Sequence, residues 1–315
     1  MLGHSLAKEI LNGSRRALAK SITLIESSLP QHRKESLDLL SSLPNVSNTL
    51  RVGICGSPGA GKSTLIEALG LHLISLGKRP AVLAIDPSSV THGGSILGDK
   101  TRMVELSVNP KAYVRPSPTQ GNLGGVTVSC SESISLCESA GFNTIIVETV
   151  GLGQSETTVD EVADLVMFVT TPAAGDSLQG IKKGIMEVAD IIVVNKADGP
   201  LAEKARYTKF ELESAVNLNL RRYHCKPEVV LCSALNKIGI DSLWKAVENT
   251  ARNLKQEISE KRHRQIKQNT KRMLEALIRT RIKEMENNSN FKKIVEDEGI
   301  PRAAAVKLLD ILFRS

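Results

Sequence analysis

Aromatic side chains are scarce in this chain. Only 3% of its 315 residues are Phe, Trp or Tyr, so the stacking platforms that hold single-stranded nucleic acids are not indicated. The net charge of +7 is modest for this length, and the basic residues gather between Arg252 and Lys283. We interpret that run as the solvated face of a helix and expect no nucleic-acid partner.

Cysteines and long apolar runs are also few. No apolar stretch approaches the roughly 20 residues that cross a bilayer, and residues 1–25 lack the apolar segment of a signal peptide. We therefore expect a soluble protein with no membrane partner, located in the cytoplasm or, in an organellar form, in the mitochondrial matrix. The cysteines form no C-x-x-C pair and are odd in number, which indicates neither a disulfide framework nor a zinc site; they are Cys55, Cys130, Cys137, Cys225 and Cys232.

Three regions follow one another along the chain. Residues 1–48 carry apolar side chains at helical spacing and predict an N-terminal helical extension, interrupted near Pro30 and ended before Pro44. Residues 49–251 alternate strand-like and helical runs and predict one α/β domain. Residues 252–315 are charged and helical in pattern, and they predict a long arm with a small helical end piece.

The middle region alternates strand-like runs with helical patterns. Such alternation predicts an α/β fold, with a mostly parallel sheet and helices on both faces. The predicted strands are Arg51–Cys55, Ala81–Ile85, Ala112–Arg115, Thr144–Glu148, Leu165–Thr170, Ile191–Asn195 and Glu228–Leu231.

A phosphate-binding loop opens this region. The motif G-x-x-x-x-G-K-[ST] lies between the first predicted strand and a helix-like stretch that runs from Thr64 to Leu76. Its backbone N–H groups would surround the α- and β-phosphates, Lys62 would reach the β- and γ-phosphates, and Ser63 would offer a hydroxyl to Mg²⁺. The loop consists of Gly56, Ser57, Pro58, Gly59, Ala60, Gly61, Lys62 and Ser63, followed by Thr64.

A base-selecting motif lies much further along the chain. Asn195, Lys196 and Asp198 follow a buried strand and form an N-K-x-D box. The Asp198 carboxylate can accept hydrogen bonds from guanine N1–H and its amino group, whereas adenine offers neither donor there. The last predicted strand leads into Cys232-Ser233-Ala234, which resembles the loop that closes over guanine. In this order behind a phosphate loop, the motifs predict GTP and GDP as ligands.

Acidic residues at two strand ends are candidates for a magnesium site. Asp86 directly follows one predicted strand and Glu148 ends another, where ligands collect in open α/β sheets. We expect both near Mg²⁺, and we expect the backbone N–H of Gly151 to sense the γ-phosphate. Leu152 stands where small signalling GTPases carry a water-orienting glutamine. Hydrolysis should therefore be slow alone and faster with a partner.

Several longer blocks carry a more specific likeness. They resemble the MeaB/ArgK family, GTPases associated with adenosylcobalamin-dependent methylmalonyl-CoA mutase, which includes the methylmalonic aciduria type A protein. The blocks are Leu18–Glu26, Gly56–Thr64, Asp86–Ser89, Gly94–Met103, Arg115–Pro118, Gly124–Val126, Glu148–Glu156 and Ala174–Gly184.

This resemblance implies a SIMIBI-like P-loop NTPase. It also implies a homodimeric G-protein chaperone that couples GTP binding and hydrolysis to cofactor loading, protection or reactivation of methylmalonyl-CoA mutase or a related acyl-CoA mutase. Asp99 is then expected near Mg²⁺ with Asp86 and Glu148, and 151–156 and 174–183 are expected to be switches. Gln179 or Lys182 could complete the catalytic site; equally, both could be solvated.

Other functions remain open on the sequence. A metallochaperone GTPase would need a Cys or His cluster for its cargo, and the six histidines and five cysteines are scattered. An ATPase or kinase linked to amino-acid transport would use ATP, which Asp198 disfavours. A binding module would use GTP only to lock a conformation.

The arm carries an apolar stripe at mostly helical spacing. A second copy of the chain is the expected cover, and packing against the N-terminal helices is the alternative. The stripe consists of Leu254, Ile258, Ile266, Met273, Leu274, Leu277, Ile278, Ile282 and Met285.

Overall fold

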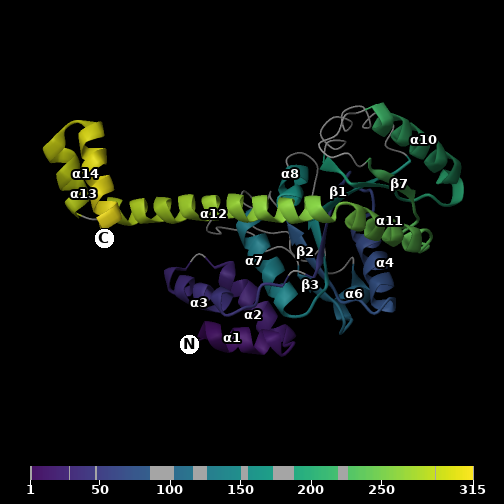
Figure 1. Cartoon of the computed structure of the whole chain (residues 1–315), viewed down its shortest axis with the longest axis horizontal. Coiled ribbons are helices and arrows are strands. Elements are labelled where there is room, and N and C mark those ends of the chain that lie inside the picture. Colours follow the sequence, from purple (N-terminus) through teal and green to yellow (C-terminus); the bar gives the residue numbers. More distant parts are fainter. Residues whose placement is uncertain are drawn as a thin grey trace.

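The computed structural model of the chain contains one large sheet, helices on both of its faces, and a long helical arm (Figure 1). It describes residues 2–27, 29–46, 48–85, 103–115, 126–149, 155–172, 188–218, 226–287 and 289–314.

Seven parallel strands form the sheet, in the order β3-β2-β4-β1-β5-β6-β7. All seven predicted strands are confirmed, with each end within one residue of its prediction. The central strands are buried throughout, as expected for a parallel sheet that is covered on both faces. Their bounds are β1 Leu50–Gly56, β2 Pro80–Ile85, β3 Tyr113–Arg115, β4 Thr144–Thr149, β5 Leu165–Thr170, β6 Ile191–Val194 and β7 Glu228–Leu231.

Two hydrophobic clusters lie on the two faces of the sheet. Strand β4 contributes Ile145 and Val147 to one cluster and Ile146 to the other, because successive strand side chains point to opposite faces. Gly53 lets α8 approach β1 closely, since a Cβ there would collide with the Val159 side chain. One face is covered by α4 (Lys62–Ser75), α6 (Val104–Val108) and α11 (Ile240–Asn253), and the other by α7 (Val126–Ser139), α8 (Ser155–Asp160) and α10 (Ala202–Leu218).

The N-terminal region forms the predicted helices α1 (Leu2–Leu11), α2 (Arg15–Ile25) and α3 (Pro30–Ser41). Pro30 occupies the first turn of α3, where its missing N–H has no helical partner to lose. Apolar side chains of all three helices join the cluster that contains α7. Strand β3 is tied to this region by an ion pair of 2.7 Å between Arg115 and Glu26.

The arm leaves the domain as α12 (Lys255–Glu286) and ends in α13 (Ser289–Glu298) and α14 (Pro301–Arg314). Figure 1 shows α12 running past the sheet and carrying α13 and α14 at its far end. At the start of the predicted stripe, Leu254 is buried and Ile258 packs against the chain's own core. Within the described part, no helix combines the length and apolarity that a membrane crossing requires.

The basic run on α12 differs from its prediction. We interpreted it as a solvated face, but the side chains of Lys261 and Arg262 are only 12% and 18% exposed. They and Arg272 form ion pairs with Asp160, Asp164 and Glu161, in and just after α8. The interpretation is therefore wrong for this part of the run. The pattern of basic residues did not show that the acidic end of α8 lies beside them.

Candidate nucleotide site

The phosphate-binding loop connects β1 to α4 at the carboxyl edge of the sheet. Gly56 and Gly61 have φ angles of 150° and 83°, which disfavour other residues. A Cβ on Gly56 would overlap the Val169 carbonyl of β5, and one on Gly61 would lie 2.7 Å from Asn195 Nδ2. The loop is fixed further by a hydrogen bond of 3.2 Å from Ser57 N–H to Val169 O. Glycine is therefore required here by close backbone packing as well as by turn geometry.

Lys62 begins α4, directly after the left-handed Gly61. Its ammonium donates to the carbonyls of Gly56 at 2.9 Å and Ser57 at 3.3 Å. Both acceptors belong to the loop, so the charge is held over the loop where the helix N-terminus also concentrates positive potential. This arrangement suits a polyphosphate.

Ser63 and Glu148 meet beneath the loop. The Ser63 hydroxyl donates to Glu148 Oε1 at 3.2 Å, and the two residues are only 8% and 4% exposed. Glu148 is on β4, in register with Ile54 of β1, so the sheet brings the acid to the helix start. A hydroxyl and a carboxylate are ligands that Mg²⁺ favours, and these two fit a metal beside bound phosphates.

Asn195 ties the phosphate loop to the loop after β7. Its Nδ2 donates to Ala60 O at 2.8 Å, while its Oδ1 accepts from Ala234 N–H at 3.0 Å and from Cys232 Sγ at 3.5 Å. The residue is 2% exposed. Predicted as part of the base-selecting motif, it thus holds together three segments that are distant in the sequence.

The predicted base-reading residues gather beside this tie. Ala197 N–H donates to Cys232 O at 3.0 Å, and Asp198 lies at the start of the following turn. Lys196 has a φ of 61°, and its side chain lies near Gly61 of the phosphate loop. Burial raises the pKa of the Cys232 thiol to about 12, so this side chain is a neutral packing group.

Asp198 has a partner that the sequence motif did not predict. Asn236 Nδ2 donates to Asp198 Oδ2 at 2.6 Å. Asn236 lies in a turn closed by two backbone hydrogen bonds between Ser233 and Ile238, of 2.9 and 3.0 Å. Asn236 follows the predicted Cys232-Ser233-Ala234 loop by two residues, and this position could have indicated a role near the base. The motif itself does not require an amide at this position.

The remaining candidates, Asp86, Asp99, Gly151, Gln179 and Lys182, lie outside the described residues. In the described part of the chain, no group of three or more His, Cys, Asp or Glu side chains forms a metal cluster. Of the predicted metal ligands, Ser63 and Glu148 are the two that lie among the described residues.

The chain resembles known proteins over most of its length. The family model described as "Methylmalonyl Co-A mutase-associated GTPase MeaB" matches residues 18–288. The chain belongs to the MeaB family. A probable GTPase of Mycobacterium tuberculosis is 53% identical over 245 residues, which cover 77% of this chain and 73% of the relative. The predicted family resemblance is confirmed.

Further relatives carry two kinds of name. The GTPase ArgK of Escherichia coli is 48% identical over 242 residues, covering 76% of this chain and 73% of ArgK. The mitochondrial methylmalonic aciduria type A homolog of Mus musculus is 47% identical over 247 residues, covering 75% of this chain and 60% of that protein. A crystal structure of a LAO/AO transport system kinase superposes with a TM-score of 0.70 at 34% identity, covering 98% of this chain and 96% of that one. The predicted P-loop GTPase fold is thereby confirmed, and the names of the relatives support GTP hydrolysis.

Proposed function

We propose that this MeaB-family protein is a GTP-hydrolysing chaperone of an adenosylcobalamin-dependent acyl-CoA mutase, with methylmalonyl-CoA mutase as the first candidate. The observation that carries the proposal is that Asn195 joins the phosphate-binding loop to the loop after β7 at the carboxyl edge of the sheet. The family description names the mutase. GTP binding and hydrolysis would be coupled to loading, protection or reactivation of that enzyme. The cytoplasmic location expected from the sequence stays a prediction.

Each predicted site residue has a proposed task. Residues 56–64 would surround the phosphates with N–H groups, Lys62 would contact the β- and γ-phosphates, and Asp198 would read guanine. Ser63 and Glu148 would hold Mg²⁺, which, when bound, neutralises charge that develops on the phosphates. Asp86 and Asp99 are proposed for the same metal shell, and Gly151, Gln179 and Lys182 for the γ-phosphate and its attacking water.

Contacts between α8 and α12 support a coupling between the site and the arm. Helix α8 begins four residues after Gly151, and its end is held by α12. Lys261 pairs with Asp160 at 2.6 Å, and Gln265 donates to the carbonyls of Asp160 and Ala163 at 3.0 and 2.9 Å. Arg272 donates two hydrogen bonds, of 2.8 and 2.6 Å, to the Glu161 carboxylate. A shift of α8 with nucleotide state would therefore move α12.

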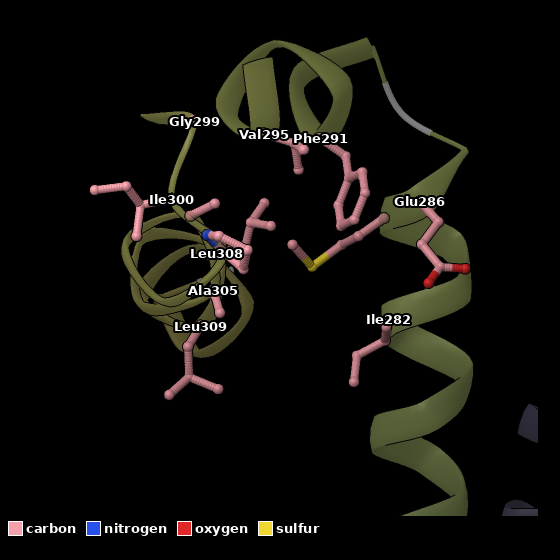
Figure 2. Close-up of a pocket in the computed structure, with 12 residues that line it drawn as sticks. Ile282, Glu286, Phe291, Val295, Gly299, Ile300, Ala305, Leu308 and Leu309 are labelled. Carbon is pink, nitrogen blue, oxygen red and sulfur yellow. The ribbon is translucent and has the colours of Figure 1, made fainter. Parts of the chain in front are cut away.

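We propose that the arm forms a homodimer and that 1–48, 49–251 and 252–315 are three functional parts. The far half of the arm leaves apolar side chains exposed, including Leu274 at 56% and Leu277 at 44%. A cavity of about 480 Å³ between α12, α13 and α14 continues this surface (Figure 2). A second copy of the chain would cover it. On the far half of the arm, the ion pair of 3.8 Å between Glu284 and Arg33 of α3 is a surface contact, which contributes little.

Complex formation with the mutase tests the proposal. The protein and purified methylmalonyl-CoA mutase would be mixed with a non-hydrolysable GTP analogue, with GDP or with an ATP analogue, and analysed by gel filtration. We expect the amount of complex to differ between the GTP analogue and GDP. The ATP analogue should not change the amount of complex. No complex in any state would contradict the mutase as partner. ATP binding in preference to GTP would instead favour a transport-linked kinase, the role for which the 34% identical protein is named.

A further inference from the structure

The carboxylate expected to read guanine already has a partner in this structure. We propose that Asn236 is a positioning residue for guanine recognition: its side-chain amide holds Asp198 in the orientation that reads the base. The inference rests on the proposed GTP specificity of the site and adds the residue that prepares it.

The hydrogen bond that carries this inference is short and leaves room for a base. Asn236 Nδ2 lies 2.6 Å from Asp198 Oδ2. A carboxylate offers about four lone-pair positions, so one bond from Asn236 leaves positions for guanine N1–H and the amino group. An Asp198 side chain that is oriented beforehand loses less rotamer freedom when guanine binds, and this lowers the cost of binding.

The turn that carries Asn236 is fixed without its side chain. Ser233 and Ile238 exchange two backbone hydrogen bonds, and Ser233 Oγ accepts from the backbone N–H of Asn236 at 3.2 Å. Ala234 N–H, at the base of the turn, is bonded to Asn195. A substitution at position 236 keeps all of these bonds, since none uses the side chain. The amide is therefore available for Asp198 rather than needed to close the turn.

The loops around this pair are open to solvent. Asn236 and Lys237 are exposed, as is Lys196 on the facing loop, and Asp198 is half-buried. A hydrogen bond in such a place contributes modestly, so we expect its loss to weaken GTP binding on the order of fivefold. ATP offers no donor to Asp198 at either position, and its weak binding should be unaffected.

The first experiment measures affinity for fluorescent GTP and ATP analogues. We compare the wild type with Asn236→Leu and with a control, Asn253→Leu, which changes an exposed Asn on α11. The inference predicts weaker GTP binding and unchanged ATP binding for Asn236→Leu alone. Equal GTP affinity of Asn236→Leu and wild type would overturn it, and so would an equal loss for GTP and ATP, which would indicate general damage to the loop.

A second variant tests the orientation directly. Asn236→Asp places a second carboxyl beside Asp198, and two carboxylates in contact strongly raise one pKa. At neutral pH the two carboxylates repel and GTP binding should weaken; when the pH is lowered far enough to protonate one of them, the shared proton supplies a donor and binding should recover. A purely structural loss would not recover with acid. If the wild type prefers GTP but neither variant alters that preference, the role of Asn236 is wrong and the proposed function stands. A wild type without any GTP preference would contradict the proposed function itself.

Discussion

Removing the carboxylate of Asp164 should strongly destabilise the fold. Asp164 lies between α8 and β5, and its side chain is fully buried. Oδ2 accepts from Arg51 N–H at 2.8 Å and from Arg262 Nη2 at 2.6 Å, while Oδ1 accepts from Arg262 Nε at 2.7 Å. One carboxylate thus joins the start of β1 to α12.

The expected cost follows from what Asp164→Ala leaves behind. Burial lowers the pKa of the Arg262 guanidinium, but the hydrogen bonds to Asp164 and the negative charges of Asp164 and Glu138 together outweigh burial and raise this pKa overall. Breaking such a buried pair by removing one partner costs about 3–5 kcal/mol. Because the Arg262 side chain is 18% exposed and can move toward water, we expect the lower end, about 3 kcal/mol.

Urea unfolding followed by circular dichroism measures this cost. The control is Glu161→Ala, whose partner Arg272 is also on α12 but in a pair that is about one-third exposed, and whose loss should cost less than about 1 kcal/mol. Adding Arg262→Met to Asp164→Ala should restore part of the lost stability, because the stranded cation is then removed. Equal costs for Asp164→Ala and Glu161→Ala would show that the buried pair stabilises the fold no more than the partly exposed one.

Four further predictions concern the site, the arm and α7. Asp198→Asn should weaken GTP binding by about 2–4 kcal/mol and favour xanthosine nucleotide, measured by nucleotide titration. Glu148→Ala should raise the Mg²⁺ concentration needed for half-maximal hydrolysis; an unchanged Mg²⁺ titration would remove Glu148 from the metal site. Leu277→Asp should yield monomers by light scattering, with GTP binding intact. Burial raises the pKa of Glu132 from 4.5 to about 7. Ionisation of this buried carboxyl therefore lowers the stability of the fold, with no effect below about pH 4.5 and the full effect above about pH 7. Glu132→Gln should therefore stabilise by about 1–3 kcal/mol at about pH 8 and change nothing at about pH 4 in urea unfolding.

The sheet could be predicted because its signals are local. Strand β5 is six consecutive apolar or β-branched residues, all buried, and the phosphate loop needs its glycines within eight positions. Pro30 likewise marked an interruption between the N-terminal helices by its own chemistry. Such features depend on a few neighbouring residues, which a sequence displays directly.

The parts that escaped prediction depend on contacts between distant segments. Asn195 is 135 residues from Ala60 and 39 from Ala234, and nothing in the motif shows that one amide joins both. The pairing of Lys261 and Arg272 with the end of α8 depends on the path of α12 across the domain. In the sequence, a helix face exposed to solvent and a helix face that forms ion pairs with another helix show the same spacing of charged residues.

The decisive measurement for the proposed function is the rate of GTP hydrolysis with and without the mutase. The wild type and Lys62→Ala would be assayed with GTP and Mg²⁺, alone and with purified adenosylcobalamin-dependent methylmalonyl-CoA mutase. We expect slow hydrolysis by the wild type alone, a clear increase when the mutase is added, and none of this activity with Lys62→Ala or with ATP. A wild-type rate that the mutase leaves unchanged would contradict a chaperone whose hydrolysis is coupled to this partner.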